Sequence, residues 1–151
     1  MKIQVRQGCF ETNSSSVHSL TIASKEDYVK WQKGKTFFAG EAWRSFFVEL
    51  SKFPTAKEVL SAIRKDLISY PNKEIAQYNI TESDLIEFLS LKEWDDSEKM
   101  AALKQYLDNN EIYSCETWEQ YISDYCYDEF EEHETTDGGE EVVGFGYYGR
   151  D

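Results

Sequence analysis

The feature that most constrains this fold is the separation of charge along the chain. Residues 105–149 contain 13 aspartates and glutamates and no lysine or arginine. Residues 1–75 carry 12 basic and 8 acidic side chains, whereas residues 76–151 carry 4 basic and 21 acidic ones. Because like charges repel one another, a compact fold must leave these carboxylates in water or set them against a cation. The second half of the chain is therefore predicted to form an acidic surface.

Length and composition indicate a single domain over residues 1–151. A chain of 151 residues, 40% hydrophobic and 15% aromatic, can build one core and is too apolar for a disordered acidic tail. No apolar run approaches the roughly 18 residues of a membrane span, and the N-terminus has no signal-peptide core. Three cysteines without CxxC spacing argue against a disulfide framework or a zinc ribbon. We expect a cytoplasmic protein with reduced thiols.

Strand signals occur at both ends of the chain. Apolar and polar residues alternate over residues 2–10, and a second apolar strand signal follows a polar loop at residues 17–22. Near the C-terminus, residues 127–135 and 140–148 flank the sequence Thr136-Asp137-Gly138-Gly139, which is typical of a β-hairpin turn. The glycines in the second arm fit a strand only at a bulge or where another backbone approaches closely.

Helix-start signals fill the middle of the chain. A capping side chain precedes an apolar run, and in several cases an acidic residue or Gln stands three positions later. The expected starts are Ser24 with Asp27, Thr55 with Glu58, Thr81 with Asp84, Asp96 or Ser97, and Thr117 with Gln120. A further short helix is expected from the helical spacing of Trp43, Phe46, Phe47 and Leu50.

The order of these signals predicts an α+β fold. We expect a small antiparallel sheet from the N-terminal strands and the C-terminal hairpin, with four to six helices between them. The helix predicted to begin at Thr117 carries an aromatic stripe at helical spacing. That stripe favours a place in the core for Trp118, Tyr121, Ile122 and Tyr125.

The polar loop near the N-terminus contains the densest motif. It reads Arg6-Gln7-Gly8-Cys9-Phe10-Glu11-Thr12-Asn13-Ser14-Ser15-Ser16-Val17-His18-Ser19. This run resembles the opening of a group of uncharacterised small proteins from bacteriophages and mobile elements of Gram-positive bacteria. The likeness covers about the first 22 residues and, more weakly, Trp31 with Gly34 and the glycine-rich C-terminus. The resemblance implies a phage or mobile-element protein in the cytoplasm of a bacterial host cell, and it implies no particular reaction.

Two interpretations of this loop stay open. Asn and Ser side chains can cap local turns, which makes the loop a structural connection. Alternatively, turn amides and hydroxyls bind an anion beside a guanidinium and an imidazole, as in a small enzyme or nucleotide-binding module such as an ADP-ribosyl transferase-like protein. The residues of that alternative site are Arg6, Asn13, Ser14, Ser15, Ser16 and His18. Because no nucleophile elbow, P-loop or dinucleotide fingerprint is present, we favour a protein without catalytic residues or a cofactor.

The acidic tail favours a protein-binding surface. Its carboxylates lack the spacing of a calcium loop or a zinc-binding helix, so no metal site is predicted. On an extended strand, alternate carboxylates repeat at about 6.6–6.8 Å, which is comparable to neighbouring phosphates, and exposed Tyr125 or Tyr127 can supply flat contacts as bases do. The predicted binding residues are Asp128, Glu129, Glu131, Glu132, Glu134, Glu140 and Glu141.

We expect this surface to occupy the nucleic-acid-binding surface of a basic host protein. A net charge of −13 disfavours direct binding of DNA or RNA, which requires clustered Lys and Arg. No membrane partner is expected, and the aromatic-rich tail allows a homodimer. The resemblance to phage proteins adds the expectation of an inhibitor of host defence, of which anti-CRISPR proteins are one kind.

Overall fold

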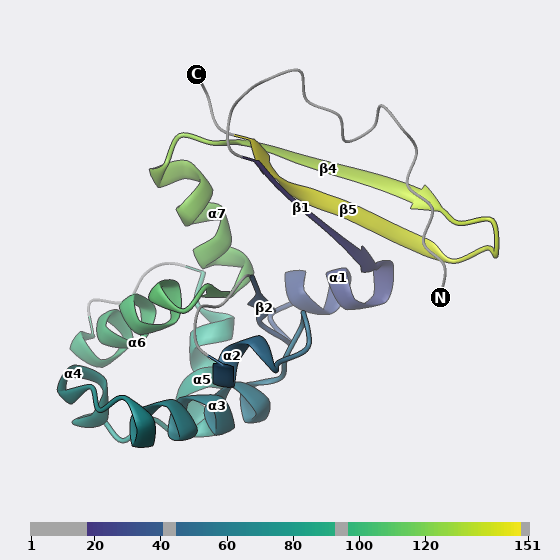
Figure 1. The fold of residues 1–151 in the computed structure, drawn as a ribbon. Helices are drawn as coiled ribbons and strands as arrows, with labels where there is room; N and C mark the ends of the chain where they lie inside the picture. Colours follow the sequence, from purple (N-terminus) through teal and green to yellow (C-terminus); the bar gives the residue numbers. More distant parts are fainter. Residues whose placement is uncertain (1–17, 41–44, 93–96, 149–151) are drawn as a thin grey trace. The chain divides into compact units, whose positions relative to one another are not determined.

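The computed structural model describes residues 18–40, 45–92 and 97–148 (Figure 1). The chain divides into two compact units. The sheet unit comprises residues 1–29 and 119–151, and the helical unit comprises residues 30–118. The borders between them fall inside two helices, α1 (Lys25–Gln32) and α7 (Cys115–Asp124). The single domain expected from the sequence is not tested by this division and stays a prediction.

The sheet unit contains a three-stranded antiparallel sheet. Its strands are β1 (His18–Ser24), β4 (Asp128–Thr135) and β5 (Glu141–Tyr148), and β5 lies in the centre (Figure 1). An N-terminal strand and the C-terminal hairpin therefore share one sheet, which confirms the predicted α+β class. The strand expected over residues 2–10 lies outside the described residues.

The hairpin closes at its Asp/Gly turn through Thr136. The amide of Thr136 donates to the carbonyl oxygen of Glu140 at 2.8 Å, and Thr136 Oγ1 accepts from the Glu140 amide at 3.1 Å. Gly139 has a φ of 85°, a conformation that favours glycine. On β5, a Cβ at Gly146 would collide with the carbonyl oxygen of Ser19. This close backbone approach explains why a glycine stands in the second arm.

One face of the sheet carries the core of the sheet unit. Val143 and Phe145 of β5 are buried, and Ala23 of β1 is paired directly with Val143. Tyr28 of α1 packs on Phe145 with 5.1 Å between the ring centroids. Alternate residues of a strand point to opposite faces, so positions 143 and 145 share the face that Tyr28 covers.

The helical unit packs short helices around an apolar core. Its helices are α2 (Ser45–Val48), α3 (Ala56–Ser69), α4 (Lys73–Ala76), α5 (Glu82–Ser90) and α6 (Glu98–Asn109), and β2 (Phe38–Ala39) pairs antiparallel with β3 (Ile112–Tyr113). The core includes Phe37, Leu85, Leu103, Leu107 and Ile112. The described residues thus contain seven helices, one above the expected range, because Asn72 caps the additional single turn of α4.

Two predicted capping boxes are confirmed. Thr55 and Glu58 satisfy each other's backbone amides at the start of α3, with distances of 2.8 and 3.3 Å. Thr81 and Asp84 do the same at the start of α5, with distances of 2.9 and 3.3 Å. Such boxes satisfy amides that have no partner inside the helix, so they define helix starts from sequence alone.

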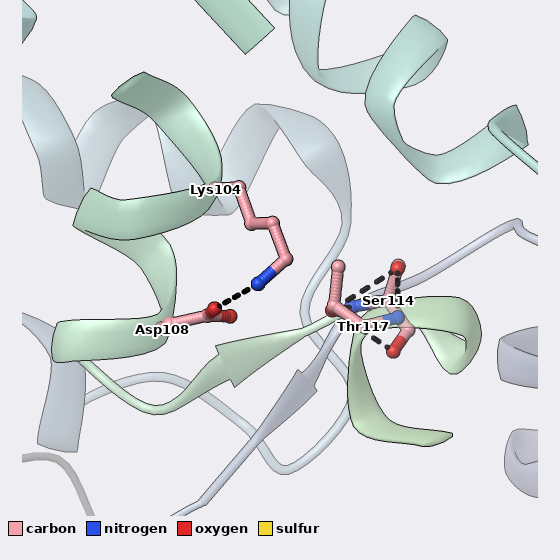
Figure 2. A network of polar contacts seen from close by, with 4 residues as sticks. All are labelled: Lys104, Asp108, Ser114 and Thr117. Carbon is pink, nitrogen blue, oxygen red and sulfur yellow. Dashed lines mark hydrogen bonds and ion pairs between the residues drawn. The ribbon is translucent and has the colours of Figure 1, made fainter. Parts of the chain in front are cut away.

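The predicted start of α7 at Thr117 is wrong. Ser114 caps this helix, because its Oγ accepts from the Thr117 amide at 3.1 Å while Thr117 Oγ1 accepts from the Ser114 amide at 2.8 Å (Figure 2). Thr117 therefore closes the box from inside the helix. Both residues are buried, which protects these hydrogen bonds from water.

Asp84 makes the α5 box sensitive to pH. Burial alone would raise the pKa of Asp84, but hydrogen bonds from Lys99 and Thr81 outweigh it and hold the pKa below its ordinary value. Lys99 Nζ lies 2.6 Å from Asp84 Oδ1. A lowered pKa stabilises the folded state above the ordinary aspartate pKa of about 3.9, and this contribution is lost as pH falls through the folded pKa.

We expect Asp84→Asn to lower the free energy of unfolding by about 1 kcal/mol at pH 7 and by much less at pH 3. Urea unfolding at the two pH values measures the difference. Glu58→Gln is the matched control. It removes a carboxylate from the capping box of α3, where no ion pair like that between Lys99 and Asp84 supports the carboxylate. A pH-independent cost for Asp84→Asn would contradict the prediction.

Candidate functional site

Strand β4 distributes carboxylates over both faces of the sheet. Five of its eight residues are acidic. Glu129 and Glu131 are paired with Tyr147 and Phe145, so they lie on the face that carries the core of the sheet unit. Asp128, Glu132 and Glu134 are paired with Tyr148, Gly144 and Val142 on the opposite face. Because alternate residues share a face, Asp128, Glu132 and Glu134 lie on one side of the strand, where Phe130 separates Asp128 from the other two carboxylates.

Most of the predicted binding residues are exposed to solvent. Asp128 and Glu134 are half-buried, whereas the exposed ones are Glu129, Glu131, Glu132, Glu140 and Glu141. The last two lie at the hairpin turn and at the start of β5. We name residues 128–148 the acidic hairpin; this segment contains eight aspartates and glutamates and no lysine or arginine.

The described lysines of the second half of the chain pair with carboxylates of the helical unit. Lys104 Nζ lies 2.6 Å from Asp108 within α6 (Figure 2), and Lys92 and Lys99 pair with Glu116 and Asp84. Within the acidic hairpin, Lys25 Nζ lies 3.4 Å from Glu141 Oε2, and His133 Nε2 lies 2.8 Å from Glu131 Oε1. Among these ion pairs, the acidic hairpin is paired with one lysine, Lys25 of α1.

Glu129 combines partial burial with the charges of two neighbouring carboxylates. Partial burial raises the pKa of Glu129, and the neighbouring carboxylates of Glu119 and Glu131 raise it further. Glu119 comes from α7, so carboxylates from two elements converge on one face of the hairpin. A cation placed among them would relieve this repulsion.

Four tyrosines gather beside Glu129. The rings of Tyr127 and Tyr147 stack at 4.4 Å with an angle of 11°, and Tyr125 stacks on Tyr127 at 5.7 Å with an angle of 13°. Tyr121 of α7 lies 4.9 Å from Tyr125 and 5.9 Å from Tyr147. We name Tyr121, Tyr125, Tyr127, Tyr147, Glu119 and Glu129 the tyrosine–carboxylate cluster.

The expected aromatic stripe of α7 is only partly a core stripe. Trp118 and Ile122 are buried, but Tyr121 is half-buried and Tyr125 is 62% exposed. Tyr125 lies beyond the end of α7 and joins the tyrosine cluster, so its predicted core position is wrong. Tyr147 is a member that the sequence did not indicate, because hairpin pairing brings it from the other end of the acidic hairpin.

The alternative loop site lies almost wholly outside the described residues. This applies to Arg6, Asn13, Ser14, Ser15 and Ser16. His18 is the first residue of β1, where its backbone is paired with Tyr148. The two interpretations of the loop therefore stay predictions.

The part of the chain that the structure describes has neither a cluster of metal ligands nor a membrane-spanning helix. No three His, Cys, Asp or Glu side chains gather there in a group able to hold a metal ion. None of its helices combines the length and apolar character needed to cross a bilayer.

No family model matches the sequence, and no curated protein or solved structure matches it significantly. The resemblance of the N-terminal motif to phage proteins therefore stays a prediction. What the chain does is inferred from its residues and their geometry.

Glu129 should lower the stability of the folded protein at neutral pH. A raised folded-state pKa means that the contribution of this group is most favourable below the ordinary glutamate pKa of about 4.3 and is lost as pH rises through the folded pKa. We therefore expect Glu129→Gln to raise the midpoint of urea unfolding at pH 7, with a gain that disappears below about pH 4.

The control for this variant is Glu132→Gln, which removes a charge from the opposite face of the same strand. We expect it to give a smaller gain at pH 7 than Glu129→Gln. Equal gains from both variants would mean that net charge, and not the convergence of Glu119, Glu129 and Glu131, sets the effect.

Proposed function

We propose that this chain is a phage or mobile-element binding protein whose acidic hairpin occupies a basic nucleic-acid-binding surface of a host protein. The observation that carries the proposal is the charge on β4, where five acidic residues in eight lie on both faces of one extended strand. Their carboxylates are mostly exposed, and Lys92, Lys99 and Lys104 of the helical unit pair with carboxylates outside the acidic hairpin.

The shape of the hairpin supports recognition of a groove that accepts nucleic acid. Glu132 and Glu134 on one face, and Glu129 and Glu131 on the other, stand two residues apart, which on an extended strand is about 6.6–6.8 Å and comparable to neighbouring phosphates. Stacked tyrosines lie on the face of Glu129 and Glu131, and their rings offer flat faces of the kind that bases offer. Charge and flat surfaces together favour a nucleic-acid-binding protein over a basic protein of any other kind.

Host defence is the setting that the N-terminal motif favours. The likeness to small phage proteins of Gram-positive bacteria makes an effector that handles nucleic acid, such as a CRISPR nuclease, the expected partner. Long-range attraction between the acidic hairpin and a basic cleft would speed association and make it dependent on salt. The protein acts in this proposal by occupying the cleft, so it needs no catalytic residue.

Capture from a Gram-positive bacterial lysate tests this function. Full-length protein is immobilised at low salt, and bound proteins are eluted with excess duplex DNA and identified by mass spectrometry. We expect nucleic-acid-binding proteins in the eluate, and we expect Glu131→Lys combined with Glu132→Lys to reduce their recovery at least about tenfold, because reversed charges repel a basic cleft.

The matched control is Glu49→Lys combined with Glu87→Lys. It changes net charge by the same amount at two exposed positions of the helical unit. Recovery should be unchanged in this variant. Equal losses in both variants, or an eluate without nucleic-acid-binding proteins, would contradict the proposed function.

A further inference from the structure

The tyrosine–carboxylate cluster contains a row of three nearly parallel rings. Tyr125, Tyr127 and Tyr147 stack in sequence, with angles of 13° and 11° between successive rings. Tyr125 ends this row and is 62% exposed. An aromatic ring carries negative charge on its face, so the open ring at the end of a stack attracts cations as well as apolar groups.

The carboxylates of the cluster add net charge to this flat surface. Glu129 is paired with Tyr147 across the β4–β5 ladder, so its side chain lies beside the ring row on the same face of the sheet. Glu119 lies near Glu129, because its charge contributes to the raised pKa of Glu129. Flat aromatic surface and negative charge therefore occur together at the end of α7 and the start of β4.

A purely structural role accounts for only part of this arrangement. Tyr121, Tyr127 and Tyr147 are half-buried and cover the edge of the sheet unit. Tyr125 adds an exposed ring that contributes little burial of its own, beside carboxylates that repel each other. Exposed tyrosines of this kind are enriched at protein interfaces, where they supply rigid contact area.

We propose that the tyrosine–carboxylate cluster binds arginine side chains of the basic partner. The planar guanidinium packs on the tyrosine rings, and Glu129 and Glu119 balance its charge. Arginine fits better than lysine because its guanidinium is flat, weakly hydrated and able to stack, whereas the lysine ammonium is a compact and strongly hydrated charge. This inference rests on the proposed function and specifies which residues of the partner the hairpin recognises.

Two synthetic peptides of equal length and charge, one with alternating Gly and Arg and one with alternating Gly and Lys, test the inference by titration calorimetry on the full chain. We expect the arginine peptide to bind about two- to fivefold more tightly, which corresponds to a cation–π contact at an exposed site. Tyr125→Leu should remove this preference, because leucine keeps apolar area without a ring. Tyr125→Phe should retain it.

The control is Tyr70→Leu, which removes an exposed tyrosine of the helical unit and should leave the preference intact. Glu129→Gln should weaken binding of both peptides. Equal affinity for the two peptides, a preference that survives Tyr125→Leu, or no binding of either peptide would overturn the arginine site. The lysate capture tests the proposed function separately, because its variants change Glu131 and Glu132 and leave Tyr125 in place.

Discussion

Backbone pairing with the central strand β5 is the interaction on which the acidic surface depends. Strand β4 has Phe130 as its one large apolar residue, so it cannot hold its place through its own burial. Strand β5 supplies the buried residues Val143 and Phe145 and is hydrogen-bonded to β1 on its other side. The apolar contacts of β5 thus stabilise a strand whose own carboxylates oppose folding, and the charge is displayed at the edge of the described sheet.

Local sequence signals predicted most of the fold because local hydrogen bonds form it. The boxes at Thr55 and Thr81 need only residues three positions apart, and the hairpin turn needs only an Asp/Gly sequence. The start of α7 was missed because Thr117 with Gln120 matches the usual pattern, whereas the box that forms at Ser114 is closed by the hydroxyl of Thr117 in place of an acidic residue or Gln. The tyrosine cluster could not be predicted from local sequence, because Tyr147 joins it only through strand pairing across the hairpin.

Two physical explanations of the acidic strand differ in which side chains they predict beside the carboxylates. Charge on an edge strand prevents like strands from pairing, which protects a protein from aggregation. Protection of the edge needs only the carboxylates and does not explain the exposed ring of Tyr125. The row ending at Tyr125 lies next to the carboxylates and enlarges an apolar surface that a protective edge would avoid. The combination therefore favours recognition of a partner over protection of the edge.

Repulsion within the hairpin also links partner binding to stability. Partial burial is the main cause of the raised pKa of Glu129, and the charges of Glu119 and Glu131 add a repulsive contribution in the folded state. A basic partner that binds the folded hairpin would relieve this repulsion, and it would stabilise the fold by an amount that grows with the logarithm of its concentration above the dissociation constant. The repulsive part of the cost at Glu129 would therefore be recovered on binding and would add to the affinity for a cationic surface.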